Sequence, residues 1–468
     1  MNTVISRMIK SAGVGALLFG FVAIGPAWGA GYPANQYTFQ DAMDAFNYGD
    51  NDKAARILWP LANSGDAQAQ YYLAYLMDSG QGLGRDVATA AGFYRKSADQ
   101  DYLPAIVYMG YISSVGRGIL KDEKEAFRWY TRGAQMGDAI AQNNLATMLR
   151  NGRPYAKNLP LAAQWFLQSA MQGNMRAQYN LATMYRLGEG IKQNLAEAVR
   201  WYTYAANQGD MYAQNALGYM YRKGEGVEKD NTAALDWYRR AAEQGHSPSE
   251  FLLAKMYEEA AAAAAAKKDD DGVQKNLEDA AIWYFHAAKG GSAKAQYRLG
   301  ILYESGTGLP QDSREALRWY TDAAEKNNYT PAMTAIAAMY ETGRKGISAD
   351  MKKAITWYSR AATLGDGAAQ FAMGRINMES EPKNLPKAYE WFSVASTSTD
   401  EEVKANAIVL RVKLSSMMKP EDVSAARLRA SRFQPVKPLT ADQVQGTTTS
   451  EQYAYDDAKD IPAKPPTK

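Results

Sequence analysis

Apolar and aromatic residues recur along this chain at the spacing of helices. In segments such as AVRWYTYAA (residues 198–206) and ALRWYTDAA (residues 316–324), alanines and aromatic rings occupy positions i, i+3, i+4 and i+7. That spacing brings them to one face of an α-helix. Each such segment is therefore predicted to be an amphipathic helix that packs through its aromatic face.

Tryptophans mark the repetition of this segment. Trp129, Trp165, Trp201 and Trp237 each stand 36 residues apart. The series continues at intervals of 34 to 46 residues with Trp59, Phe93, Trp283, Trp319, Trp357 and Trp391. A period of this length is typical of stacked helix pairs. The pattern therefore predicts one all-α repeat array rather than several compact domains.

Each aromatic helix has predicted start and stop residues. An Asp or Asn that can accept hydrogen bonds from free backbone N–H groups precedes every helix: Asp86, Asp122, Asn158, Asn194, Asp230, Asn276, Asp312, Asp350 and Asn384. Glu125, Glu197 and Glu315 are expected to complete capping boxes. Left-handed C-terminal caps are expected at Gly137, Gly173, Gly209, Gly245 and Gly365.

A shorter helix is predicted after each of these glycines, as in AQYNLATMYR (residues 177–186) and AQNALGYMYR (residues 213–222). Positions 1, 5, 6, 8 and 9 of this ten-residue pattern are predicted to pack, and small residues such as Gly110 and Gly218 allow a neighbouring helix to approach closely. Positions 3, 4, 7 and 10 form a second face by helical spacing.

We expect this second face to bind a partner, because Tyr, Asn and Arg side chains bind well at low ordering cost. Tyrosines cluster in the first two units, and position 10 changes from arginine in the middle units to Glu258, Glu304 and Glu341 further on. A groove with an aromatic end, a polar and basic middle and an acidic far half is predicted. Alternatively, the tyrosines pack between units and the charges are solvated. The predicted binding residues are Tyr71, Tyr72, Tyr75, Tyr108, Tyr111, Asn143, Asn144, Thr147, Arg150, Tyr179, Asn180, Thr183, Arg186, Asn215, Tyr219 and Arg222.

Together, these aromatic, capping and turn residues resemble the SEL-one-like repeat family, a branch of the tetratricopeptide-type solenoids. The resemblance implies a right-handed α/α solenoid of about nine helix pairs over residues 39–430, with a helical insertion at 258–275 and capping helices at 401–430. It also implies that the short helices line a concave face. Members of this family act as protein-interaction adaptors, so the resemblance implies a non-enzymatic scaffold with a protein partner.

The two ends of the chain have a different composition. Residues 1–29 have a basic start, an apolar core at 12–25 and small residues at Ala27 and Gly29, which is typical of a secretory signal. We expect cleavage after Gly29, a short linker at 30–38 and a periplasmic or secreted protein; the alternative is an uncleaved membrane anchor. Residues 431–468 are rich in Pro and Thr and are predicted to be a disordered tail.

The candidate chemistry is sparse. There are 53 Lys and Arg residues against 50 Asp and Glu residues and no long basic run, so nucleic acid is not expected as a partner. The chain has no cysteine, and its two histidines, His246 and His286, lack ligand spacing, so neither a cofactor nor a metal is expected. Residues 267–278 have partial calcium-loop spacing, but Lys267 occupies the first ligand position. A solvated extension is predicted instead, in which residues 258–268 lengthen one helix. Two other functions stay open: an envelope hydrolase acting on β-lactams or peptidoglycan, and a carbohydrate-binding adaptor in exopolysaccharide export.

Overall fold

The structure is a computed structural model that describes residues 37–436, and these residues form 22 α-helices without a β-strand. The prediction of an all-α fold is confirmed. The helices are α1 (Phe39–Asn47), α2 (Asn51–Asn63), α3 (Ala67–Ser79), α4 (Val87–Asp99), α5 (Leu103–Val115), α6 (Glu123–Gln135), α7 (Ala139–Asn151), α8 (Leu159–Met171), α9 (Met175–Leu187), α10 (Leu195–Asn207), α11 (Met211–Lys223), α12 (Asn231–Glu243), α13 (Ser247–Ala266), α14 (Asp270–Lys289), α15 (Ala293–Ser305), α16 (Ser313–Asn327), α17 (Thr330–Thr342), α18 (Met351–Thr363), α19 (Gly367–Glu379), α20 (Leu385–Ala395), α21 (Glu401–Ser415) and α22 (Pro420–Ser431).

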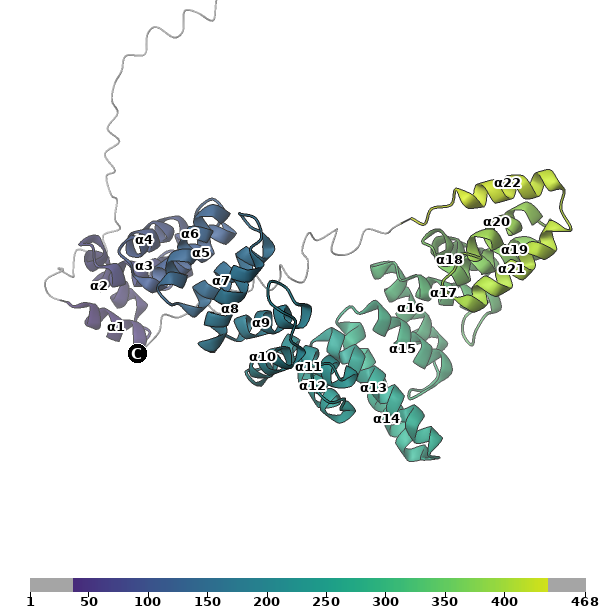
Figure 1. Ribbon diagram of the computed structural model, residues 1–468, viewed down its shortest axis with the longest axis horizontal. Helices are drawn as coiled ribbons and strands as arrows, with labels where there is room; N and C mark the ends of the chain where they lie inside the picture. Colours follow the sequence, from purple (N-terminus) through teal and green to yellow (C-terminus); the bar gives the residue numbers. More distant parts are fainter. Residues whose placement is uncertain (1–36, 437–468) are drawn as a thin grey trace, which may run out of the picture. The chain divides into compact units, whose positions relative to one another are not determined.

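The described chain divides into two compact units, residues 37–141 and residues 142–436. Within each unit, consecutive helices form hairpins (Figure 1). The closest pairs join a short helix to the aromatic helix that follows it, such as α3 with α4 and α5 with α6 in the first unit, and α9 with α10 and α11 with α12 in the second. This is the helix-pair repeat that the tryptophan spacing predicts.

The predicted helix starts are confirmed at all positions but one. The side chains of Asp86, Asp122, Asn158, Asn194, Asp230, Asp312, Asp350 and Asn384 each accept a backbone N–H at the start of their helix. The prediction for Asn276 is wrong, because α14 starts seven residues earlier, with Asp269 as its cap. Asn276 lies inside α14, where its Nδ2 donates to the carbonyl of Gly272 at 2.7 Å.

The insertion of the sixth unit explains this difference. The alanine run that precedes Lys267 has high helix propensity and prolongs α13, and Asp269 then starts α14 at once, so both helices reach 20 residues. Their far ends extend past the neighbouring helices of the second unit (Figure 1). The inserted residues thus lengthen both helices of the pair, whereas the sequence suggests an extension of the first.

The predicted capping boxes are incomplete, because the Glu carboxylates do not bind back to the capping residues. Glu125, Glu197 and Glu315 do stand where their backbone N–H groups bind the capping side chain. Their carboxylates instead form ion pairs with Arg95 at 2.6 Å, Arg200 at 3.4 Å and Arg318 at 2.5 Å, respectively. The backbone N–H of each capping residue is already bound, because Asp122, Asn194 and Asp312 each donate to a carbonyl of the preceding helix at 2.8 to 2.9 Å.

The predicted C-terminal glycines are confirmed. Gly137, Gly173, Gly209, Gly245 and Gly365 follow the last residues of their helices with φ between 80° and 101°. Close approach is also confirmed at Gly218 and Gly110. A β-carbon on Gly218 would lie 2.7 Å from the ring of Tyr238, and one on Gly110 would lie 2.5 Å from the ring of Tyr130.

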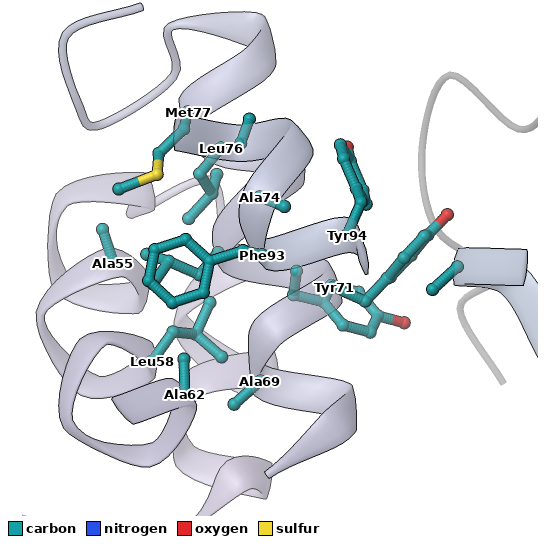
Figure 2. Close-up of a cluster of buried hydrophobic side chains, with 14 of the residues drawn as sticks. Ala55, Leu58, Ala62, Ala69, Tyr71, Ala74, Leu76, Met77, Phe93 and Tyr94 are labelled. Atoms are coloured by element: carbon teal, nitrogen blue, oxygen red, sulfur yellow. The ribbon is translucent and has the colours of Figure 1, made fainter. Parts of the chain in front are cut away.

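Aromatic and alanine side chains fill the core of each unit. Figure 2 shows the ring of Phe93 among Ala55, Leu58 and Met77 in the first unit. Phe93 is 8% exposed, and Leu58 is fully buried. Small alanines leave room for the large rings, so the helices can pack closely.

A buried glutamine links successive helix pairs and was not anticipated from the sequence. It stands at position 2 of the short helix, as in Gln178 and Gln214, which are 5% and 4% exposed. The Nε2 of Gln178 donates to the carbonyl of Ala170 at 3.2 Å, and its Oε1 accepts from Gln208 at 2.7 Å. Gln214 repeats this arrangement with Ala206 and Gln244. The same glutamine therefore binds a carbonyl near the end of the preceding aromatic helix and the capping glutamine side chain of the following one.

The C-terminal end of the described chain contacts the second unit. Phe433 packs against Trp391 at 5.9 Å between ring centroids, and the N–H of Val436 donates to the carbonyl of Thr363 at 2.9 Å. The prediction of a disordered tail from residue 431 is wrong for residues 431–436.

The signal at 1–29, most of the linker and the rest of the tail lie outside the described residues. No helix in residues 37–436 combines the length and apolar character needed to span a bilayer.

Candidate binding groove

The tyrosines of the predicted aromatic end belong to a packed cluster of the first unit. Tyr71 and Tyr72 are 3% and 5% exposed, so the prediction that they lie on a binding surface is wrong. Phe39 and Phe46 of α1 lie edge-on to Tyr72, at 5.6 and 5.7 Å between centroids. Tyr102 covers Tyr71 at 5.4 Å. The opening helix therefore buries residues that would otherwise face solvent.

The other predicted residues of this unit, Tyr75, Tyr108 and Tyr111, are half-buried. Tyr108 donates to Asp78 at 2.5 Å, and Arg117 forms an ion pair with the same carboxylate at 2.9 Å. Burial and the hydrogen bond to Asp78 raise the pKa of the Tyr108 hydroxyl above its usual value. This network anchors the tyrosine ring, so the alternative that these tyrosines pack between helices is the better description of the first unit.

In the second unit, by contrast, the predicted residues of α7, α9 and α11 line a cavity of about 360 Å³. Phe166 of α8 and Pro248 of α13 form part of its wall, and Arg176, Tyr212 and His246 add polar and aromatic groups. Seven of the predicted residues meet here: Asn143, Thr147, Arg150, Tyr179, Asn180, Thr183 and Asn215.

An adjoining cavity of about 280 Å³ shares Tyr179, Tyr212 and Asn215 with the first and contains the predicted residues Arg186 and Tyr219. We call the two cavities together the groove. Its lining contains amide, hydroxyl, guanidinium and aromatic groups and no carboxylate. The groove therefore offers hydrogen-bond donors and flat rings to a ligand.

Asparagines from successive repeats are connected along the groove. Asn180 donates to Asn143 at 3.4 Å, and Asn143 donates to Asn144 at 3.0 Å. Asn143 and Asn144 are each 3% exposed, and the Nδ2 of Asn144 has no hydrogen-bond partner among the described residues. Asn144 is not among the residues that line the groove.

His246 sets the orientation of the third asparagine. Its Nδ1 lies 2.8 Å from Ser249 Oγ, and Ser249 donates to Asn215 Oδ1 at 2.9 Å. Because the serine hydrogen is directed to Asn215, Ser249 accepts from Nδ1–H, and Nε2 of His246 is left as an acceptor. Burial lowers the pKa of His246 to about 4, so the ring is neutral at neutral pH. Asn215 keeps its two N–H donors for the groove.

Sequence reasoning did not assign His246 to the groove, although a signal was present. It occupies the cap position of the short helix, where other repeats have residues such as Asp66, Asn174 or Asp210. His246 makes no capping hydrogen bond. A residue that departs from the cap pattern and leaves the cap unmade is available for another role.

The His246–Ser249 pair does not form a catalytic nucleophile. Ser249 is fully buried, and its hydroxyl hydrogen is bound to Asn215, so Oγ cannot reach a substrate in the groove.

No group of three or more His, Cys, Asp or Glu side chains within residues 37–436 is arranged to hold a metal ion. In the segment with partial calcium-loop spacing, Asp269 caps α14 and accepts the N–H of Gly272 at 2.9 Å.

Five of the six charges at position 10 form ion pairs, which corrects the predicted gradient from basic to acidic. Arg150 pairs with Glu189 at 2.9 Å, and Arg222 pairs with Glu259 at 2.5 Å and lies outside both cavities. The glutamates further on are likewise paired with arginines of the following units: Glu258 with Arg298, Glu304 with Arg344, and Glu341 with Arg375. Each partner stands 34 to 40 residues away in the sequence. These ion pairs therefore link neighbouring repeats and do not form a surface of unpaired charge.

The family follows from a sequence comparison. The Sel1 repeat model matches nine successive segments, at residues 67–102, 103–138, 139–174, 176–210, 212–246, 247–292, 293–328, 330–366 and 367–400. This chain belongs to the Sel1 repeat family. The resemblance and the α-solenoid fold predicted from the sequence are confirmed, and the groove is formed by the third to sixth Sel1 repeats.

Two solved structures are similar over most of their length. One is a protective antigen of uropathogenic Escherichia coli with an SLR fold, 26% identical, with a TM-score of 0.68, covering 92% of this chain and 89% of that chain. The other is a Sel1 repeat protein from Oxalobacter formigenes, 29% identical, with a TM-score of 0.52, covering 65% of this chain and 88% of that chain. The comparison with curated proteins found no sequence match. Sel1 repeat proteins are generally non-catalytic scaffolds for protein interactions.

Proposed function

We propose that this Sel1 repeat protein is an exported, non-enzymatic scaffold that binds a segment of a protein partner in the groove of α7, α9 and α11. The observation that carries the proposal is that seven predicted binding residues from three successive repeats line one cavity. The site of action would be the periplasm or the cell exterior.

The chemistry of the groove suits a polypeptide. An asparagine amide can donate to a backbone carbonyl and accept from a backbone N–H, and the groove presents Asn180 and Asn215 on adjacent short helices. Tyr219 is 39% exposed and offers a flat ring to an apolar side chain. A cavity of about 360 Å³ falls within the size range of ligand sites.

The binding proposal is tested by crosslinking and quantitative mass spectrometry of envelope extracts. Asn180→Ala removes an amide of the groove, and Tyr219→Ala removes the exposed ring. The matched control is Tyr204→Ala, since Tyr204 is 45% exposed on α10 and lies outside both cavities. Partners enriched by the wild type and by Tyr204→Ala are expected to fall at least about tenfold with the combined groove variant, since lost interface contacts cost about 1 to 3 kcal/mol. Equal recovery with all variants would refute the proposal.

A carbohydrate partner is the second candidate, because tyrosine rings and amides also suit sugar rings, and Tyr179, Tyr212 and Tyr219 all line the groove. Binding of purified protein to a bacterial glycan panel, lost in the same groove variant, would assign the groove to a sugar. Turnover of a β-lactam or muropeptide panel above background by purified protein would instead favour a hydrolase.

Export is tested separately. Sequencing of the mature N-terminus from the envelope fraction is expected to begin at Ala30, after cleavage behind Gly29. Recovery of the intact chain from the cytoplasm would refute export without affecting the groove.

A further inference from the structure

A further cavity, of about 520 Å³, lies at the C-terminal end of the array and shares no lining residue with the groove. It is enclosed by the last turns of α20, α21 and α22. Two arginines, Arg411 and Arg427, line it together with Tyr389 and several serine hydroxyls, and its lining contains no carboxylate. A cavity with two guanidinium groups and no acid has an unbalanced positive charge.

These two arginines differ from most others in the described chain. Many guanidinium groups elsewhere in residues 37–436 pair with carboxylates, as Arg375 does with Glu341 and as Arg429 does with Glu390 at 3.0 Å. Within residues 37–436, Arg411 and Arg427 form no ion pair. Arg411 donates to Ser396 Oγ at 3.1 Å, and Arg427 reaches the Tyr389 hydroxyl at 3.5 Å. A guanidinium has five N–H donors, so most of their donors are available to a ligand.

The arginines are also not needed to satisfy the carbonyl groups at the ends of the three helices. Serine hydroxyls already donate to carbonyls in the last turns. Ser396 donates to Ser393 at 2.7 Å, Ser415 to Val412 at 2.6 Å, and Ser431 to Leu428 at 2.9 Å. Capping of these helix ends therefore does not depend on Arg411 or Arg427.

Tyr389 supplies one more donor. Its side chain is 3% exposed, and its hydroxyl oxygen accepts from Arg427, which leaves its own hydrogen free to donate to a ligand. The cavity thus combines two guanidinium forks with a buried phenol. This combination of donors suits a tetrahedral oxyanion, since guanidinium binds phosphate oxygens in a bidentate manner.

We infer that the cavity between α20, α21 and α22 binds a phosphate group through Arg411, Arg427 and Tyr389. The phosphate belongs either to a small soluble molecule or to a lipid headgroup. Val409 and Val412 of α21 are 64% and 61% exposed, and Val412 lines the cavity, so an acyl chain would have an apolar surface beside the phosphate. The two sources are separated by experiment, and the inference does not depend on the proposed partner in the groove.

The first arm uses inorganic phosphate as the probe, with the mature chain and isothermal titration calorimetry. The Arg411→Gln, Arg427→Gln double variant is expected to weaken phosphate binding at least about tenfold, because two charge-assisted contacts are lost. The control is Arg429→Gln, which removes a nearby arginine that is paired with Glu390 outside the cavity. The single variant Arg427→Gln changes an exposed side chain and keeps the test valid if the double variant folds poorly.

The second arm uses flotation with vesicles of phosphatidylglycerol and, for comparison, phosphatidylcholine. Flotation with the anionic vesicles that is lost in the double variant and kept in Arg429→Gln would assign the phosphate to a lipid. Phosphate binding without flotation would assign it to a soluble molecule. If wild type and double variant behave alike in both arms, the inference is wrong.

Discussion

The short helices of the two units carry tyrosine, asparagine or threonine at the same repeat positions, yet these side chains have different surroundings. In α3 of the first unit, Tyr71 and Tyr72 stand at positions 3 and 4 and are buried under neighbouring rings. In α9 of the second unit, Tyr179 and Asn180 stand at the same positions and line the groove. The position within a repeat therefore does not decide whether a side chain is available to a partner.

Side-chain volume and local cover account for the difference. Positions 3, 4 and 7 are all tyrosine in α3, whereas in α7 they are Asn143, Asn144 and Thr147. Large rings fill the space between helices, and smaller polar side chains leave part of it empty. In addition, α1 covers the rings of α3 in the first unit. The first unit uses this face for stability, and the second unit keeps it open.

The largest expected effect separates a packed tyrosine from an open one. Tyr71→Ala removes a buried ring from the first unit and is expected to cost about 3 to 5 kcal/mol in unfolding free energy. Tyr219→Ala removes a ring that is 39% exposed and is expected to cost less than about 1 kcal/mol. Urea denaturation followed by circular dichroism measures both. Similar costs for the two variants would contradict the contrast drawn between the units.

The next effect tests the anchor of the tyrosine cluster. Asp78→Asn is expected to cost about 1 to 3 kcal/mol, because it weakens the bonds to Tyr108 and Arg117 and leaves buried donors poorly matched. The same denaturation experiment measures it. Asp101→Asn is the control, since Asp101 forms an ion pair with Arg132 at 2.6 Å but is 66% exposed. If both variants lose equal stability, Asp78 is not an anchor.

A smaller effect in the groove depends on pH. Because burial lowers the folded-state pKa of His246 to about 4, the neutral ring contributes stability above its unfolded pKa of about 6.5. This contribution is lost as the pH falls from about 6.5 to about 4. His246→Gln is expected to flatten the decline of melting temperature over this range. An unchanged profile in His246→Gln would show that the ring titrates normally.

The smallest effect concerns the charges at position 10. In a double-mutant cycle, Arg150→Gln and Glu189→Gln are expected to give a coupling of about 0.2 to 1 kcal/mol, since both side chains are partly exposed. A coupling that is absent would mean that Arg150 is free to bind a partner, as the sequence alone suggested.

Features governed by nearby residues were predictable from the sequence. The capping Asp or Asn, the glycines with positive φ and the tryptophan period each depend on residues within about one turn or one repeat. Asn276 is the exception that supports this explanation, because an earlier cap, Asp269, and a run of alanines compete with it locally. The Sel1 fold follows from these signals repeated nine times.

Contacts between repeats were decided only by the tertiary structure. The burial of Tyr72 depends on Phe39 and Phe46, which precede it by more than 20 residues, and the pairing of Arg150 depends on Glu189 in the following repeat. His246 joins the groove because Ser249 and Asn215 of different helices come within hydrogen-bonding distance. Helical periodicity assigns a side chain to a face, but packing determines which other side chains meet that face.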